Sequence, residues 1–501
     1  MAISNTPLDD VLLSKPDADA HQSLTRAETT YAPLYTYTLP RGQGKHYQQQ
    51  YADMYFARLA QLKPPLQQIA AEAFSDFEIG GEYARKVDRV LDVRQGELCW
   101  VIGTVYMEMP LKPNVLEDIG KEHWIAAPPA REKYTGEVEQ MMLEDESGRL
   151  RMTGTFLSGC LLVTGAIVAV LGTENKEGEF EVLDLRVPDL PRQPQRWEKE
   201  DGAAARKGGK ASGQKRSQGG KLAIVSGLSV SGDEGDTLAL DLLMEYLLGE
   251  AASADQSSAA NISRLVIAGN SLAHSQPIPT REEVAAAKKG GRKTYGYDAS
   301  AYNAAPTDRL DSWLAALLPS IPVTLLPGAT DPTSTALPQQ PIHAAMFPHS
   351  RNYMEHPIPQ EADGDNWFDT TTNPSDLDIH GWRFLGAGGQ TLDDVYRYVH
   401  GEERLEMMEA MLRWRLTAPT APDTLWCYPF QDGDRFVMRE SPHVYFVGNQ
   451  PKFETGVVEG PQGQSVRIIA VPKFRETGEV VLIDLETLVP EIMKIQLFEG
   501  S

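Results

Sequence analysis

Hydrophobic and polar positions follow a strand-like pattern in the first part of the chain. Between residues 85 and 192, short apolar runs alternate with polar turns, as in ELCWVIGTVYM at 97–107 and YTGEVEQMMLED at 134–145. Runs of this length, rich in β-branched and aromatic residues, are typical of β-strands. About five or six such strands suit a small barrel, and we expect an OB-fold over residues 85–192.

The pattern changes at residue 221, where buried strands begin to alternate with amphipathic helices. Apolar strands are expected at 222–226, 264–269 and 322–328, with helices from about Asp236 and over 307–318 between them. This alternation predicts a mainly parallel sheet. Further strand runs near the end of the chain predict a second sheet. The expected fold class is therefore α/β plus all-β, with an α/β sandwich over residues 221–501 joined to the barrel.

The first 84 residues have weaker patterns. Residues 1–40 are rich in Ser, Thr, Pro, Asp and Ala without periodicity, and we expect a disordered tail. Residues 41–84 show helical periodicity, interrupted by Pro64 and Pro65, which are expected to divide the segment into two helices. Its apolar face is expected to pack on the same chain, and binding to a partner is the alternative.

Residues 193–220 are rich in Gly, Ala, Lys and Arg and lack apolar periodicity. Such a composition predicts a basic, flexible linker. The alternative interpretation is a nuclear localisation patch, formed by Arg206, Lys207, Lys210, Lys215 and Arg216.

Composition and charge restrict the possible functions. The 501 residues carry a net charge of −23, so the chain as a whole is not expected to grip a phosphate backbone. Its three cysteines are far apart, which argues against a zinc module or iron–sulfur cluster. The most apolar stretch, from Leu161, is shorter than the roughly 20 residues that span a bilayer. We expect no membrane association and a cytosolic or nuclear location.

Glycine-containing loops follow four predicted strands, in the frame where calcineurin-like phosphoesterases carry metal ligands. Those enzymes use carboxylate and imidazole ligands for two cations roughly 3.5–4 Å apart. The ligand positions of this chain instead hold Gly227, Ser229, Asn270, Ala329, Thr330, Asn449 and Pro451. Glycine and alanine offer no side-chain donor, and neutral hydroxyls and amides are poor ligands for a hard dication. We therefore expect no metal, no cofactor and no catalytic residue in an inactive phosphoesterase-like domain.

Some residues that could bind a metal remain near these loops, so an active metal site is the alternative. The candidates for an improvised metal site are Asp331, His349, Asp376, Asp378 and His380. An active metal-dependent phosphodiesterase or nuclease would need several of them to meet at one place. Surface or core roles are the expectation.

Several stretches together resemble a known family. They are LAIVSGL, RLVIAGNSL, VTLLPGATDPT, MFPHS, TNPSDLDIHGWRFLGAGGQTLDDVYRY, APTAPDTLWCYPF and SPHVYFVGNQPKF. In this combination the chain resembles the B (small, regulatory) subunits of the replicative DNA polymerases alpha, delta and epsilon. The GAGGQTLDDVYRY and CYPF stretches favour the delta enzyme, with the alpha or epsilon subunit as the alternative.

The resemblance implies a non-catalytic scaffold: an OB-fold joined to an inactivated calcineurin-like phosphoesterase domain. It implies docking to the cysteine-rich C-terminal domain of the catalytic subunit. It also implies contact with a third subunit that reaches the sliding clamp, and a nuclear role in DNA replication and repair. Single-strand binding by the barrel is a further alternative. Trp100, Tyr106, Trp124 and Phe156 are its candidate stacking residues, but the acidic hairpin at 137–146 argues against it.

Overall fold

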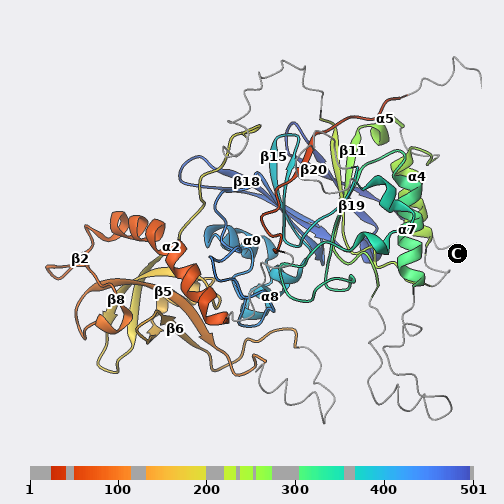
Figure 1. Ribbon diagram of the computed structural model, residues 1–501. Helices are drawn as coiled ribbons and strands as arrows, with labels where there is room; N and C mark the ends of the chain where they lie inside the picture. Colours follow the sequence, from red (N-terminus) through yellow and green to blue (C-terminus); the bar gives the residue numbers. More distant parts are fainter. Residues whose placement is uncertain are drawn as a thin grey trace, which may run out of the picture.

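The computed structural model describes residues 24–40, 50–113, 131–198, 219–232, 237–251, 256–273, 304–354 and 367–496. Its ribbon shows a barrel beside a larger body of two sheets (Figure 1). Helices α8 (Gln390–Tyr398) and α9 (Arg404–Arg413) lie between the barrel and the sheets. No helix in the described ranges is long and apolar enough to cross a bilayer.

The barrel is a six-stranded sheet that closes on itself. Its hydrogen-bonded order is β4-β5-β6-β7-β9-β8, and β5 also pairs with β8, which closes the ring. Five strands form the ring, which is the number of strands in an OB-fold. The strands are β4 (Arg85–Lys86), β5 (Cys99–Glu108), β6 (Gln140–Glu144), β7 (Arg149–Thr153), β8 (Ile167–Glu174) and β9 (Phe180–Arg186).

The first sheet of the larger body has the order β13-β12-β11-β10-β19-β20. Strands β10 to β13 run parallel to one another. Strand β19 pairs antiparallel with β10, and β20 pairs antiparallel with β19. Helices α4 (Leu238–Leu248), α5 (Gln256–Ala260) and α7 (Ala305–Leu317) provide the crossovers that parallel strands need. The strands are β10 (Lys221–Val225), β11 (Ile262–Ala268), β12 (Val323–Leu326), β13 (Phe368–Thr370), β19 (Glu479–Asp484) and β20 (Pro490–Lys494).

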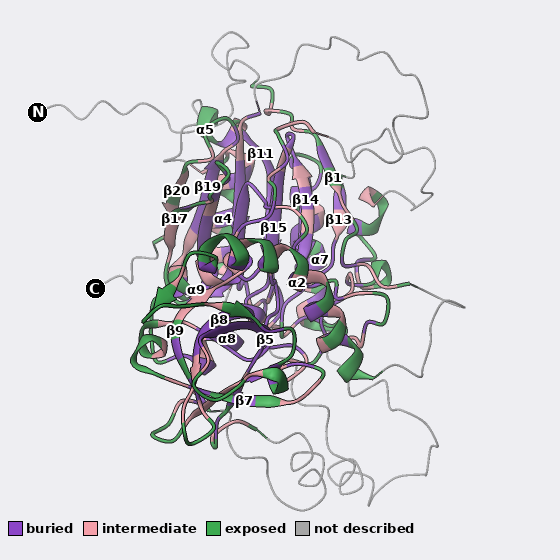
Figure 2. Cartoon of the chain, turned by 90° about the vertical axis from the view of Figure 1, so that its left-hand side faces the viewer, coloured by how far each residue is buried: buried purple, intermediate pink, exposed green. Residues whose placement is uncertain are grey.

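The second sheet has the order β1-β14-β15-β16-β18-β17. Strands β15, β16 and β18 are parallel to one another. The pairs β1–β14, β14–β15 and β17–β18 are antiparallel. Its members are β1 (Tyr31–Pro33), β14 (Ser375–Ile379), β15 (Trp382–Ala387), β16 (Val444–Gln450), β17 (Glu454–Glu459) and β18 (Ser465–Pro472). The central strands are almost wholly buried (Figure 2), because helices cover their outer faces.

Apolar side chains from both sheets form the core of the sandwich. Ile224 and Val266 of the first sheet meet Phe384 and Phe446 of the second in one cluster. A separate cluster lies under α4 and α7. The third and largest cluster unites the barrel, the long helix α2 and helices α8 and α9. The barrel and the sandwich therefore share a hydrophobic core.

Helix α2 (Tyr51–Phe74) is continuous through Pro64 and Pro65, so the prediction of two helices was wrong. Pro64 is exposed, so the carbonyl that loses its partner can bond to water. Buried leucines on both sides of the prolines, Leu62 and Leu66, hold the helix on the barrel. Packing thus outweighs the local cost of proline. A short hairpin follows, formed by β2 (Glu78–Ile79) and β3 (Glu82–Tyr83).

The described part of the first 40 residues is folded, contrary to the expectation of disorder. Strand β1 pairs with β14, and Tyr31 donates its hydroxyl to Asp369 at 2.6 Å. Arg26 donates to the carbonyls of Ala259, Ile262 and Leu247. These backbone acceptors, which carry no sequence pattern, explain why periodicity could not reveal the contact. Residues 1–23 lie outside the described residues.

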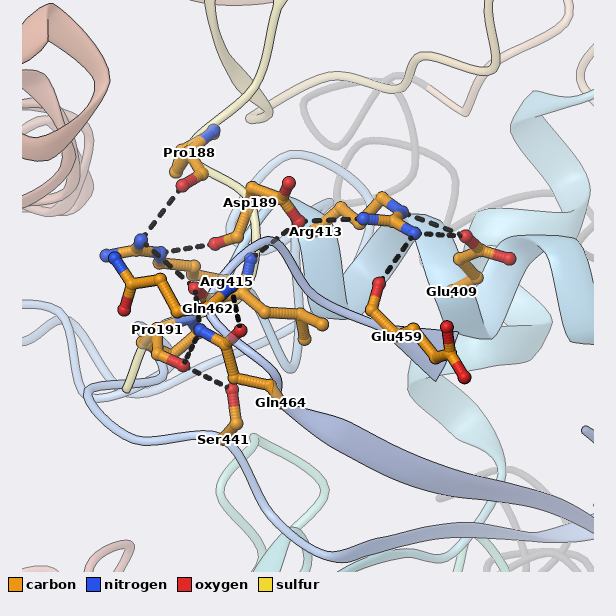
Figure 3. A network of polar contacts seen from close by, with 11 residues as sticks. Pro188, Asp189, Pro191, Glu409, Arg413, Arg415, Ser441, Glu459, Gln462 and Gln464 are labelled. Carbon is orange, nitrogen blue, oxygen red and sulfur yellow. Dashed lines mark hydrogen bonds and ion pairs between the residues drawn. The ribbon is translucent and has the colours of Figure 1, made fainter. Parts of the chain in front are cut away.

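The segment between the barrel and the sandwich is strapped to the sandwich by side-chain donors (Figure 3). Arg415 donates to the carbonyls of Pro188, Asp189 and Leu190. Gln464 and Ser441 donate to the carbonyl of Pro191 at 3.1 and 2.7 Å.

The same contacts continue into the segment predicted as a flexible linker. Gln193 donates to Pro442 and Ser465, and the Trp197 ring meets His380 edge-on. The linker prediction was therefore wrong for 193–198, because main-chain carbonyls and one Trp make these contacts without an apolar pattern. Its basic residues, Arg206, Lys207, Lys210, Lys215 and Arg216, lie outside the described residues.

Candidate functional site

The four predicted loops meet where strands of the two sheets end. Strands β10, β11 and β12 are parallel, so their carboxyl ends share one edge, where ligand sites of such sheets gather. The Gly227 N–H donates to the Gly269 carbonyl at 3.0 Å, and the Asn449 N–H donates to Ser226 Oγ at 2.7 Å. The second bond joins the end of β16 to the loop after β10.

Close approach explains two of the glycines in these loops. Gly227 has φ of +62°, and a Cβ there would lie 2.8 Å from Asn449 Oδ1. A Cβ on Gly328 would lie 2.3 Å from the backbone nitrogen of Asn270. Side chains at either position would displace their neighbours, since real Cβ contacts are longer than this.

The polar residues at the predicted ligand positions form hydrogen bonds within the loops. Asn270 Oδ1 accepts the Thr330 N–H at 3.3 Å, and Asn449 Nδ2 donates to the Gly388 carbonyl at 2.7 Å. Ser229, Asn270 and Asn449 all have positive φ, at 48°, 51° and 59°. Asparagine adopts this conformation more readily than most residues. The side-chain amides of Asn270 and Asn449 therefore hold the loops together.

The structure brings together five of the seven predicted positions: Gly227, Ser229, Asn270, Thr330 and Asn449. The other two, Ala329 and Pro451, lie next to these positions in the chain but are exposed to solvent.

A triangle of side-chain amides, absent from the sequence prediction, is hydrogen-bonded to these loops. Gln339 Oε1 accepts hydrogen bonds from Asn373 Nδ2 and Gln390 Nε2, at 2.8 and 2.9 Å. Asn373 Nδ2 also donates to Gln390 Oε1, and Asn373 Oδ1 accepts the Gly388 N–H. Gln339 reaches the Gly328 carbonyl at 3.1 Å. We call Gln339, Asn373 and Gln390, together with Asn270 and Asn449, the amide cluster. In the sequence, the polar stretch TTN before Pro374 contains Asn373.

Asp331 is the one remaining carboxylate of the prediction that lies at these loops. It is buried and accepts the backbone N–H groups of Gly328, Ser271 and Leu272. Burial raises the pKa of Asp331 above its usual value, although these hydrogen bonds oppose the shift. Because these contacts are all to the backbone, Asp331 acts as an anchor for the loops.

The other potential ligands lie elsewhere. His349 is exposed, and its N–H donates to Asp311. Asp376, Asp378 and His380 belong to β14 or follow it. Because β14 runs antiparallel to β15, it leads away from the loops, and His380 ends within 3.4 Å of Glu486. The described residues contain no group of three or more His, Cys, Asp or Glu side chains placed to hold a metal ion.

The candidate stacking residues of the barrel differ in burial. Trp100 is buried, and Tyr106 is half-buried beneath Lys112 and Arg149, whose charges lie 4.7 and 4.4 Å from its ring centroid. Phe156 is exposed, and Trp124 lies outside the described residues.

Comparisons with known proteins cover both parts of the chain. Residues 222–455 match the family of DNA polymerase alpha/epsilon B subunits, and residues 50–185 match the DNA polymerase delta subunit OB-fold domain. The second match confirms the predicted OB-fold.

Three curated relatives extend this similarity over most of the chain. The DNA polymerase delta small subunit of Arabidopsis thaliana is 34% identical, covering 88% of this chain and 90% of its own. The Saccharomyces cerevisiae small subunit is 32% identical, covering 97% and 98%. The DNA polymerase delta subunit 2 of Drosophila melanogaster is 32% identical, covering 92% and 96%. This chain therefore belongs to the family of DNA polymerase delta small subunits.

Proposed function

We propose that this chain is a non-catalytic scaffold of the DNA polymerase delta complex, with a calcineurin-like phosphoesterase domain that has lost its chemistry. The observation that carries the proposal is the amide cluster. Neutral amides bond to one another and to backbone groups at the strand ends where such enzymes hold cations. Two dications need anionic ligands to offset their mutual repulsion, and the cluster supplies none.

The proposed partners follow from the resemblance of the sequence to this family. The chain would dock the cysteine-rich C-terminal domain of the catalytic subunit and hold a third subunit that reaches the sliding clamp. Its role would be in DNA replication and repair synthesis in the nucleus, with DNA contacted weakly or through the complex. The delta names of the relatives support this over the alpha and epsilon alternatives.

The shared core supports a scaffold role, because partners on both domains would then be held at a fixed separation. Arg58 of α2 is buried at the junction and donates to Asp434, Pro419 and Ala421 of the sandwich. It also donates to Gly165 of the barrel at 3.4 Å. An arginine with this many acceptors ties two domains together specifically.

Elemental analysis of the purified chain tests the loss of chemistry, together with a manganese-supplemented assay on a model phosphodiester. We expect no stoichiometric metal and no turnover. Stoichiometric metal with turnover that Asp331→Ala or His349→Ala abolishes would contradict the proposal. Co-expression with the catalytic subunit tests the scaffold role separately, and we expect a complex that survives gel filtration.

A further inference from the structure

A pocket of about 550 Å³ lies between the N-terminal segment and the loop before β16. One wall is the segment from Leu34 to Pro40, and the other is the loop from Tyr428 to Pro442. Arg435 ties the walls together by donating to the carbonyls of Thr36 and Thr38. This volume is within the usual range for ligand pockets, and the fixed walls mean that it is already formed.

Arg383 of β15 lines this pocket and is only 8% exposed. Among the described residues, its guanidinium makes no hydrogen bond or ion pair. Its backbone is fixed, because the Arg383 N–H donates to His443 Nδ1 and its carbonyl accepts the His443 N–H. The Arg383 side chain is mostly buried, and a buried guanidinium is costly unless an acceptor meets it.

Four carboxylates near Arg383 have other partners. Asp434 is bonded to the buried Arg58, and Glu440 faces Arg192. The Glu198 carboxylate accepts hydrogen bonds from Arg192 and from the Gln195 N–H. The positive charge of Arg383 is a smaller cause of its lowered pKa. Asp378, across the strand from Arg383, accepts the Gly381 N–H. Since no described residue bonds to the Arg383 guanidinium, a bound partner would supply its acceptor.

The rest of the lining indicates which anion fits. Asp376 and Asp432 also line the pocket, so a doubly charged phosphate would be repelled more strongly than a singly charged carboxylate. The planar guanidinium matches a carboxylate with two parallel hydrogen bonds. Leu34, Tyr428 and Val437 add apolar surface that would contact side chains on either side of the carboxylate.

We propose that this pocket binds an acidic–apolar peptide segment of a partner protein, in which an Asp or Glu carboxylate meets Arg383. The exposed Arg439 at the rim would assist its approach. The inference concerns a surface separate from the amide cluster and does not depend on which polymerase subunit supplies the peptide.

Peptides matched in all but charge test the proposal on the full chain. The probes are acetylated tetrapeptide amides in which Glu or Gln is flanked by Phe, Leu, Tyr or Pro. By calorimetry, we expect the best Glu peptide to bind about 10-fold more tightly than its Gln counterpart. Equal affinities, or no saturable binding by any Glu peptide, would overturn the proposal. So would inorganic phosphate that displaces the Glu peptide at equal concentration.

Two variants locate the binding. Arg383→Met should weaken the Glu peptide about 10-fold while leaving the Gln peptide unchanged. Arg439→Met, at the exposed rim, should weaken it by less than about 3-fold, since an exposed charge is screened by salt. Unchanged Glu-peptide affinity in a folded Arg383→Met protein would place the peptide elsewhere and overturn the assignment. The peptide comparison needs no variant, so it decides the question if Arg383→Met fails to fold.

Discussion

The strand-end loops and the junction between barrel and sandwich are both buried and polar, but they use opposite chemistry. In the amide cluster, neutral side chains accept and donate among themselves, and no net charge is buried. At the junction, a charged guanidinium with 1% of its side chain exposed meets a carboxylate and several carbonyls. Neutral groups close a site, whereas a buried charge makes a domain contact specific, because any misplacement leaves that charge unpaired.

Of the changes considered, replacing Arg58 by Met should lower the stability of the protein most. The variant leaves Asp434 buried without its cation, which typically costs about 3–5 kcal/mol. Hydrogen exchange of the α2 amides should report that loss directly. The double variant Arg58→Met/Asp434→Asn is the control and should recover part of the stability. A single variant as stable as the parent would show that the charge is not what joins the domains.

The buried, neutral side chain of His443 should make the stability of the protein depend on pH. Burial lowers its pKa from 6.5 to about 4, so the folded protein keeps it neutral while the unfolded chain takes up a proton. Stability should therefore fall as the pH drops from 6.5 to 4, by roughly 3 kcal/mol at most.

His443→Asn removes the titration and keeps an acceptor for the Arg383 N–H. The difference in stability between parent and variant should change with pH only within the window of His443 titration. A difference that stays constant from pH 7 to pH 4 would contradict the assignment.

An aspartate introduced into the strand-end loops tests how tightly these loops are packed. Gly227→Asp meets Asn449 at 2.8 Å, whereas Gly96→Asp has a similar positive φ but nothing within 4 Å. Both changes carry a backbone cost of about 1–3 kcal/mol. Only the first adds crowding, so we expect it to lower the melting temperature further. Equal losses would show that the loops adapt.

The smallest effect is expected at the partly exposed strap. Arg413 pairs with Asp189 at 2.7 Å, with side chains 31% and 27% exposed. Such pairs are worth about 0.2–1 kcal/mol. Arg413→Gln and Asp189→Asn, alone and combined, form a double-mutant cycle for urea unfolding. A coupling above about 2 kcal/mol would make the strap comparable with the Arg58 junction.

Sequence patterns predicted the elements that depend on local regularity. The barrel strands and the glycine loops at Gly227, Gly269 and Gly328 follow from apolar runs and from backbone positions that favour glycine. Three members of the amide cluster escaped prediction, because Gln339 and Asn373 lie in separate loops, Gln390 begins helix α8, and they share no spacing. The continuous α2 also escaped, because Pro64 is a strong local signal that only packing of the whole barrel overrides.

Strand β1 has a consequence for the order of events during synthesis. Tyr31 and its partner Asp369 are 338 positions apart. At about 5–20 residues per second, a ribosome needs roughly 20–70 s to make the intervening chain. The whole barrel emerges during this time, while the N-terminal segment still lacks its sheet. The sandwich is therefore completed by the first described residues of the chain, and a nascent protein truncated before β14 would leave this strand without a neighbour.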